Sequence, residues 1–328
     1  MGYEVDFLPI TAGGAAISVR WGTPGDYKIL VFDVGTAISG ERLVAHIERL
    51  YMCSRVDYLV SSHPAPDHVA GLGVVLERLE VGELWMHRPW VFSSALRRQL
   101  GTAYALERAA LSQGVPVLQP FAGAKIGPFT VLSPHRDWYA DALIPDFDYR
   151  RVRGERRGQR GEGRHSARMA ALLGTPGRWM MPTGPDAARN ESSAVLYADF
   201  DGRGVLLTGR AGVRALGAAA DHAERLGLHL PSALRLMQLP DRGNAGNLST
   251  LVLDRLVGPP LRWSTSEFTK SAFISVGLDG NDEPCRTVTD ALARRGVASF
   301  STRGLSLHHA FEMPDRGWYR ARPSALTT

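Results

Sequence analysis

Apolar residues in the first third of the chain switch between the spacing of strands and that of helices. The runs 15–21 and 27–35 predict two strands, and the Gly-Pro turn between them is typical of a hairpin loop. Residues 41–51 place apolar side chains every three or four positions, which predicts a helix. A strand at 55–63 and a helix at 70–79 follow. Alternation of this kind, opened by a hairpin, predicts an α/β fold with a partly antiparallel sheet.

The same alternation continues downstream, with one interruption. From about 136 to 190 no apolar period persists and Gly, Arg and Pro are frequent, so we expect a flexible Arg-rich insertion with one short helix near 167–173. Outside this insertion, the pattern predicts a single domain over residues 1–328. Its further elements are strands at 82–90, 124–135, 234–240 and 272–277, helices at 95–114, 213–227, 251–257 and 288–296, and a hairpin at 193–210.

Composition adds one strong feature, a basic segment within the insertion. Residues 149–168 carry eight Arg and two Glu, and this excess is larger than the net charge of +5 of the whole chain. Clustered guanidinium groups bind phosphate backbones by releasing counterions, so nucleic acid is one candidate partner and an acidic protein another. Only Tyr149 offers an aromatic ring there, which argues against base stacking. A solvated segment that binds nothing is the third alternative.

Hydropathy bears on the location of the protein. No stretch reaches the roughly 18 consecutive apolar residues of a membrane span. The first residues, MGYEVDFLPITAGG, include early acidic groups and lack the basic and then apolar order of a secretory signal. We therefore expect no membrane association and a cytoplasmic location.

The candidate chemistry begins in the segment SSHPAPDHVA, residues 61–70. His63, Asp67 and His68 offer three metal-capable side chains in one short turn after an apolar run. Asp33 ends the preceding strand in VFDVG, where an Asp before Gly can simply form a turn.

Six segments, in this order, resemble the metallo-β-lactamase fold, and more narrowly the β-lactamase-like domain of bacterial competence DNA-uptake proteins and their soluble relatives. The resemblance covers nearly the whole chain apart from the insertion. The segments are LPITAGGAAISV (8–19), VFDVG (31–35), SHPAPDHVAGL (62–72), NESSAVLYADFDGRGVLLTGR (190–210), LMQLPDRGN (236–244) and FISVGLDGNDEP (273–284).

The resemblance implies a four-layer αβ/βα sandwich in which two mixed sheets face each other between outer helices. It also implies a cleft where the loops after residues 35, 62, 209, 240 and 278 meet. In this family a His-x-[His/Asp]-x-Asp-His motif holds up to two adjacent cations, which activate a water for attack on a phosphoryl or acyl centre. His63, Asp67 and His68 match that motif. The resemblance also implies that Asp33 supports these ligands from behind, as an alternative to its role in the turn.

Other positions depart from the family pattern. Ala65 occupies the second ligand place and has no donor atom. Arg210, in LLTGR, stands where the family has the Asp that bridges two metals, and a guanidinium accepts no hydrogen bond and repels a dication. Asp241 and Arg242 replace the His pair of a PHHG segment. These changes predict that the two-metal site is lost.

Two changes remain in the expected cleft. Glu283 replaces the His before a Pro, and Gly14 replaces an Asp in the opening turn.

Two metal states are left open by these residues. In the first, His63 is an orphaned ligand, while one divalent cation, Mn²⁺ or Mg²⁺ rather than Zn²⁺, binds a mainly carboxylate set. That set is Asp67, His68, Asp241 and Glu283. In the second, Arg210 forms ion pairs with Asp67 or Asp241, and no metal binds.

Two functions follow, one for each state. The first is a degenerate relative that serves as a binding or scaffolding subunit and holds an anion with Arg210 and Arg242. Soluble members of the family occur in multi-component bacterial systems, including defence, which implies a protein partner. The second is a single-metal phosphodiesterase or nuclease in which Asp67 and His68 bind the cation and Arg242 stabilises phosphoryl charge.

Overall fold

Two seven-stranded sheets form the centre of the protein. The computed structural model describes residues 1–11, 14–147, 185–261, 268–277 and 284–317. The first sheet has the order β14 (Leu307–Phe311), β1 (Gly2–Phe7), β2 (Ala16–Thr23), β3 (Asp26–Val34), β4 (Arg55–Val60), β5 (Glu80–Trp85) and β6 (Val117–Leu118). The second has the order β13 (Val297–Ser301), β12 (Lys270–Ile274), β11 (Leu234–Gln238), β10 (Gly204–Leu207), β9 (Val195–Asp199), β8 (Phe129–Ser133) and β7 (Lys125–Ile126).

Both sheets are mixed, as the sequence predicts. From β14 to β3 the neighbouring strands are antiparallel, and from β3 to β6 they are parallel. The second sheet is antiparallel from β7 to β10 and parallel from β10 to β13. The predicted hairpin at 193–210 is present as β9 and β10, which turn at Asp201 and Gly202.

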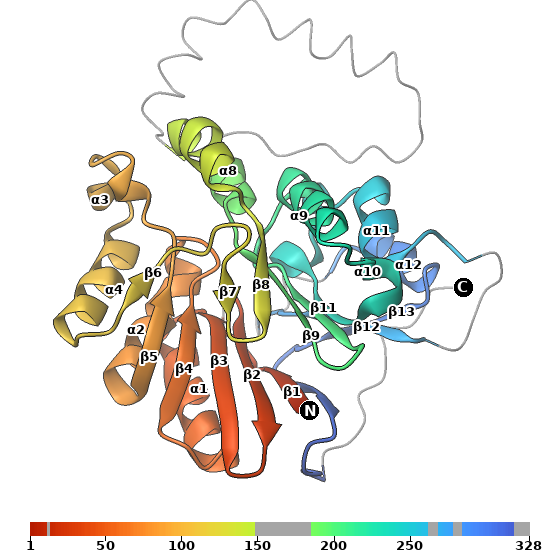
Figure 1. The fold of residues 1–328 in the computed structure, drawn as a ribbon, viewed down its shortest axis with the longest axis horizontal. Coiled ribbons are helices and arrows are strands. Elements are labelled where there is room, and N and C mark those ends of the chain that lie inside the picture. Colours follow the sequence, from red (N-terminus) through yellow and green to blue (C-terminus); the bar gives the residue numbers. More distant parts are fainter. Residues whose placement is uncertain (12–13, 148–184, 262–267, 278–283, 318–328) are drawn as a thin grey trace, which may run out of the picture.

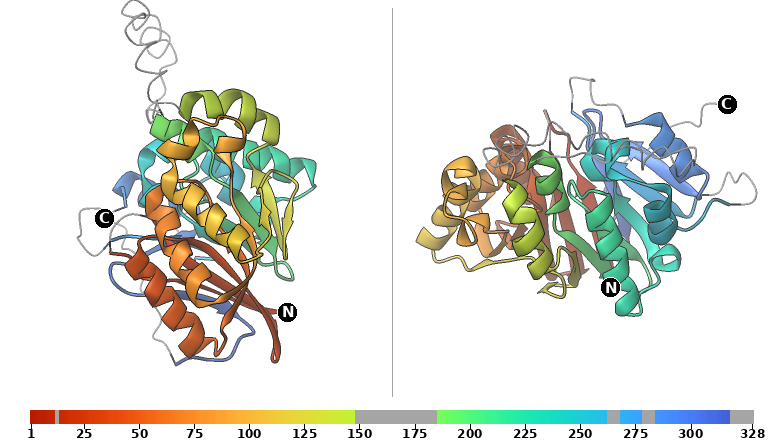
Figure 2. Two further views of the ribbon diagram at one scale, coloured as in Figure 1. Left: turned by 90° about the vertical axis from the view of Figure 1, so that its left-hand side faces the viewer. Right: turned by 90° about the horizontal axis from the view of Figure 1, so that it is seen from above.

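Helices cover the outer face of each sheet (Figures 1 and 2). The first sheet is covered by α1 (Ala37–Leu50), α2 (Pro66–Arg78), α3 (Leu96–Gln99) and α4 (Gly101–Ser112). The second is covered by α9 (Val213–Arg225), α10 (Leu230–Ala233), α11 (Thr250–Val257) and α12 (Arg286–Ala293). Short helical turns complete the described chain: η1 (Pro89–Val91), α5 (Arg136–Trp138), η2 (Tyr139–Leu143), η3 (Ile144–Phe147), α8 (Pro185–Glu191), η4 (Pro240–Gly243) and η5 (Ala245–Asn247).

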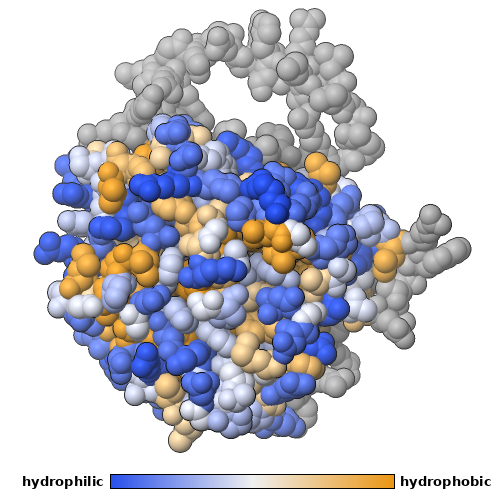
Figure 3. All heavy atoms as spheres, viewed as in Figure 1, coloured by the Kyte–Doolittle hydropathy of each residue, from blue (hydrophilic) through white to orange (hydrophobic). Residues whose placement is uncertain are grey.

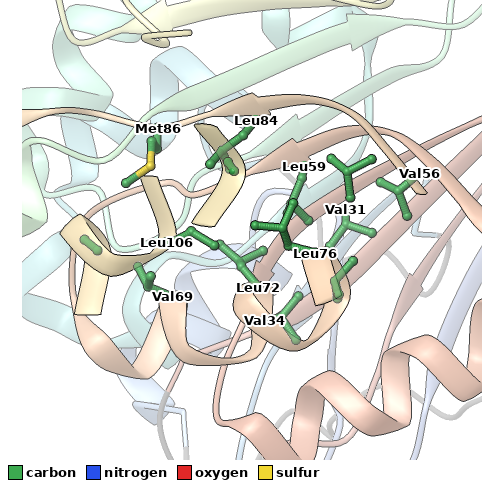
Figure 4. Close-up of a cluster of buried hydrophobic side chains, with 14 of the residues drawn as sticks. Val31, Val34, Val56, Leu59, Val69, Leu72, Leu76, Leu84, Met86 and Leu106 are labelled. Carbon is green, nitrogen blue, oxygen red and sulfur yellow. The ribbon is translucent and has the colours of Figure 1, made fainter. Parts of the chain in front are cut away.

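Three apolar clusters correspond to the three interfaces of a four-layer sandwich. Tyr3, Phe7 and Phe129 belong to the cluster between the sheets. A second cluster joins the first sheet to its helices, and Figure 4 shows Leu72 and Leu76 of α2 within it. The third lies under α9 and α11. The predicted four-layer αβ/βα sandwich is therefore confirmed.

The structure differs from the sequence prediction at three places. Strand β1 was not predicted at all. The predicted strand 124–135 is two strands, because Gly127 turns the chain with a φ of 55°. The insertion was placed too early: helical turns occupy 136–147, and Tyr139 and Phe147 are fully buried in the core against the first sheet. The basic segment 149–168 lies outside the described residues.

The surface has the mixed polarity of a globular protein. On the face shown in Figure 3, polar and apolar side chains are interspersed. Within the described ranges, no helix combines the length and the apolar character needed to cross a bilayer.

Candidate functional site

The His-Asp-His segment forms the turn between β4 and α2. β4 ends at Val60, and α2 begins at Pro66, whose ring occupies the first helical turn, where its missing N–H costs nothing. Asp67 follows in the same turn, where a carboxylate favours the positive end of the helix dipole. The prolines therefore fix the start of the helix, and the three polar side chains leave the backbone from a rigid corner.

Asp33 connects the two histidines from behind. Its side chain is fully buried, and its backbone is left-handed with a φ of 53°. Oδ1 accepts a hydrogen bond from the backbone N–H of Ser62 at 2.7 Å, and Oδ2 accepts one from Ser62 Oγ at 2.6 Å. Oδ2 also accepts a hydrogen bond from Nδ1 of His68 at 2.8 Å. Asp33 therefore does more than form a turn: it fixes the position of the loop and the orientation of one ring.

These contacts also determine the tautomer of His63. A carboxylate only accepts, so the single hydroxyl proton of Ser62 points to Asp33. Ser62 Oγ lies 3.0 Å from Nδ1 of His63 and must accept from it, which leaves Nε2 of that ring unprotonated. Nε2 of His63 is buried and has no hydrogen-bond partner among the described residues. Burial, followed by the neighbouring His68 and Arg210, lowers the pKa of His63 well below its usual value.

Arg210 lies between two carboxylates on different loops. Its Nε donates to Oδ1 of Asp241 at 2.9 Å, and its Nη1 donates to Oδ2 of Asp67 at 3.2 Å. The two pairs differ in burial: the side chain of Asp241 is 7% exposed and that of Asp67 is 37% exposed. Asp241 also accepts a hydrogen bond from Nδ2 of Asn244 at 3.2 Å. The ion pairs expected from the sequence as alternatives are both formed.

Side-chain amides hold the backbone of the Arg210 loop in place. Oε1 of Gln238 accepts from the N–H groups of Thr208 and Gly209, each at 2.9 Å. Nδ2 of Asn247 donates to the carbonyl of Arg210 at 2.8 Å. The guanidinium therefore starts from a fixed backbone position.

The loop after β11 has an unusual backbone. Asp241 and Arg242 both have left-handed conformations, with φ of 43° and 60°, and Gly243 follows with 78°. Two consecutive non-glycine residues in this region are uncommon and store strain, a feature that clusters at functional sites.

A small pocket lies where these loops meet. It is lined by Gly14, His68, Gly209, Arg210, Gln238, Leu239, Asp241, Arg242 and Ser275. Its free space has room for about one water molecule. Of the five loops predicted to meet, those after residues 62, 209 and 240 contribute to this lining. The loop after 35 contributes no lining residue, and the segment 278–283 lies outside the described residues.

The described residues do not fit a pair of metal ions. Ala65 contributes no donor atom, and Arg210 occupies the space between Asp67 and Asp241. One group of three, Asp33, His63 and His68, brings its ligand atoms within 4.8 Å of one another. Asp33, however, already accepts three hydrogen bonds and acts as the support of the histidines. A single cation held by His68 and Asp67 would require Arg210 to release Asp67.

The sequence-predicted residues fall into three groups. His68, Arg210, Asp241 and Arg242 line one pocket, and Asp67 is joined to it through Arg210. His63 is packed behind them, with ring centroids 4.3 Å from His68. Glu283 lies outside the described residues, so its predicted role as a ligand stays a prediction.

Four polar residues of the site were not predicted: Ser62, Gln238, Asn247 and Ser275. Ser62 lies inside the motif, and Gln238 interrupts an apolar strand, so both carried a signal in the sequence. Asn247 and Ser275 carried none, because their relation to the site depends on how distant loops pack. His87 is fully packed rather than cleft-lining: it stacks on Tyr139 with centroids 4.6 Å apart.

Two facing mixed sheets, outer helices and strand-end loops that meet at the histidine motif are the features expected from the motif order. The chain forms an αβ/βα sandwich that is consistent with the metallo-β-lactamase fold. No model of a known protein family matches it, and no curated protein matches it.

Solved structures with similarity to this fold share little sequence with it. The metallo-β-lactamase fold protein YhfI from Bacillus subtilis aligns with 94% of this chain and 100% of its own, at 11% identity and a TM-score of 0.45. A diphosphatase from the PhnP family aligns with 95% of this chain and 98% of its own, at 10% identity and a TM-score of 0.43. A metallo-β-lactamase from Hirschia baltica covers 78% and 99%, at 12% identity and a TM-score of 0.33. Likenesses of this size say nothing about activity.

Proposed function

We propose that this protein is an anion-binding member of the metallo-β-lactamase fold in which Arg210 replaces the two-metal centre. The observation that carries the proposal is the bridge from Arg210 to Asp67 and Asp241. A guanidinium stays protonated at all physiological pH values, so it always places one positive charge between these two carboxylates. It also repels a dication at contact range. The protein would then act as a binding or scaffolding subunit.

Elemental mass spectrometry of the purified full chain tests this function. We expect no stoichiometric Zn, Mn or Fe in the unmodified protein. The double variant Ala65→His with Arg210→Asp restores a donor and a bridging carboxylate, and it should take up metal. Ala65→His alone is the matched control, because it adds a donor and keeps the guanidinium; it should stay metal-free. Stoichiometric metal in the unmodified protein would refute the proposal.

One observation favours a second candidate, a single-metal phosphodiesterase. The unprotonated Nε2 of His63 has no partner among the described residues, and the neighbouring His68 donates Nδ1 to Asp33, as a nitrogen ligand supported by a carboxylate does. When bound, a cation would supply Lewis acidity to a phosphate diester. Here His63, His68 and Asp67 would hold it, and Arg242 would offset charge on the phosphoryl oxygens. Hydrolysis of bis(p-nitrophenyl) phosphate with added Mn²⁺, lost in His68→Ala, would support this candidate over the first.

The partners follow from charge and remain proposals. The basic segment 149–168 fits an acidic protein or the backbone of a nucleic acid. Binding to a single-stranded oligonucleotide that weakens steeply with salt, and that is lost when 149–168 are deleted, would identify nucleic acid as the partner. A multi-component assembly would instead be found by co-purification with a second protein that the same deletion releases.

A further inference from the structure

The pocket beside Arg210 contains a serine hydroxyl that has no hydrogen-bond partner among the described residues. Ser275 follows β12, is 4% exposed and lines the pocket together with Arg210 and Arg242. Its Oγ has no hydrogen-bond partner among the described residues. Buried polar groups in native proteins are nearly always paired, so a lone hydroxyl at a pocket wall points to a group that completes it on binding.

The two carboxylates at Arg210 are not held equally. Asp241 is buried, receives 2.9 Å and 3.2 Å hydrogen bonds from Arg210 and Asn244, and lies on the strained loop. Asp67 is over a third exposed and makes one 3.2 Å contact with Nη1. An exposed pair of this kind contributes little net stability, because water competes for both charges. Asp67 is therefore the carboxylate that can leave.

The contacts of Arg210 and the size of the pocket also indicate that Asp67 must leave before a ligand binds. Asp67 and Asp241 occupy two donors of the Arg210 guanidinium, its Nη1 and its Nε. The free space of the pocket has room for about one water molecule. A larger anion therefore needs both space and a donor, and the departure of Asp67 frees Nη1 of Arg210 to donate to it.

We propose that Asp67 is a built-in competitor in an oxyanion site formed by Arg210, Arg242 and Ser275, and that a terminal phosphoryl group binds by displacing it. The inference rests on the proposed binding function and names the ligand class of that site. Exchange of one anion for another at Arg210 requires no metal.

The donor set favours a phosphoryl group over a carboxylate. Arg210, Arg242 and Ser275 follow three neighbouring parallel strands, β10, β11 and β12, and line one pocket. A phosphoryl group presents three strong acceptor oxygens, and a carboxylate presents two. Nδ1 of His68 is already engaged by Asp33, so this nitrogen does not add a donor.

Calorimetric titration of the full chain with inorganic phosphate tests the competition. Asp67→Asn removes the competing charge at nearly constant shape and should tighten phosphate binding by about fivefold or more. Glu41→Gln is the matched control: it breaks an exposed ion pair with Arg78, at the opposite end of α2, and should leave the affinity unchanged. Ser275→Ala should weaken binding without disturbing either ion pair.

A second pair of variants tests the guanidinium. Arg210→Gln should abolish phosphate binding. Arg255→Gln should not, although Arg255 also bridges two carboxylates, Asp221 and Glu224, and is 25% exposed against 22% for Arg210. If Arg210→Gln does not fold, Ser275→Ala and Asp67→Asn still decide the question.

The outcomes separate this inference from the function on which it rests. If Asp67→Asn leaves phosphate affinity unchanged while Arg210→Gln abolishes it, the competitor role is wrong and the binding function stands. If acetate binds as tightly as phosphate, the phosphoryl class is wrong. If no variant binds phosphate, the inference fails, and metal analysis alone decides the proposed function.

Discussion

Oδ2 of Asp33 accepts a hydrogen bond from Nδ1 of His68 at 2.8 Å, which links the end of β3 to the first turn of α2. The same carboxylate binds both the backbone and the hydroxyl of Ser62. The site thus rests on one buried acid that positions two loops.

Asp33→Asn tests how much the site depends on that acid. Asn adopts left-handed backbone as Asp does, but it loses the charge and one acceptor that serves a buried donor. We expect a loss of about 2–3 kcal/mol in the free energy of unfolding, measured with urea. Asp201→Asn is the control, because Asp201 has the same φ of 53° and is exposed; its loss should be less than about 1 kcal/mol. Equal effects would show that backbone conformation, not the buried hydrogen bonds, matters.

The turn between β1 and β2 has no room for a side chain at Gly14. It has a φ of 76°, and an added Cβ would overlap the carbonyl oxygen of Asp67. Gly14→Ala should therefore cost about 3 kcal/mol in unfolding free energy, from strain and overlap together. Gly25→Ala, at a φ of 89° with open space around it, isolates the strain and should cost about 1 kcal/mol. A Gly14→Ala variant as stable as Gly25→Ala would show that the two loops separate easily.

Much of the fold follows from periodicity, and the strand that was missed shows where periodicity fails. In β1 the apolar Tyr3, Val5 and Phe7 alternate with Glu4 and Asp6, but all of them are buried. The acids are tolerated because distant partners cover them. These partners are Arg20, His46, Tyr51, His308 and Arg316, and Arg316 lies 310 residues from Asp6.

The same cluster has an electrostatic consequence for Asp6. Burial alone would raise the pKa of this carboxyl, but hydrogen bonds from His308 and His46 and the charge of Arg316 lower it well below its usual range. None of these contacts is encoded in local spacing. A strand with charged residues that are buried and paired therefore resembles, in its sequence, a solvent-exposed loop.

In the candidate site, the residues of one sequence motif were predictable, but the residues that tertiary packing brings to it were not. His63, Asp67 and His68 lie in one motif, and the ion pairs of Arg210 follow from its sign and its place at a strand end. The segment 136–147 was assigned to the flexible insertion because no apolar period persists from about 136 to 190, yet Tyr139 and Phe147 pack into the core. Tertiary packing there overrides a weak local period.

A double-mutant cycle should show that the two ion pairs of Arg210 differ in strength. Arg210→Gln combined with Asp241→Asn should give a coupling energy of about 2 kcal/mol, because the pair is buried and short. Arg210→Gln combined with Asp67→Asn should give less than about 1 kcal/mol. Urea denaturation of the single and double variants measures both. A larger coupling for Asp67 would contradict its role as the carboxylate that leaves.

The last prediction concerns pH and the packed His87. Its ring is buried against Tyr139 and Phe121, neither nitrogen has a partner within the described part of the chain, and burial lowers its pKa to about 3. The unfolded chain binds a proton near pH 6.5, and the folded protein does not until about pH 3. Between these values the unfolded state holds more protons, so stability falls as pH falls, by about 1.4 kcal/mol per pH unit for this group.

His87→Phe keeps an aromatic ring and removes both unpaired nitrogens. It should be at least as stable as the unmodified protein at pH 7.5, since the two buried nitrogens of His87 that lack a partner are removed. Its loss of stability from pH 7.5 to 5 should be smaller by about 2 kcal/mol, in urea denaturation at each pH. His229→Gln, at an exposed position, is the control for loss of one imidazole and should keep the original pH dependence. If His87→Phe keeps it as well, the ring of His87 is not buried in its neutral form, and the aromatic packing around Tyr139 would have to open to water.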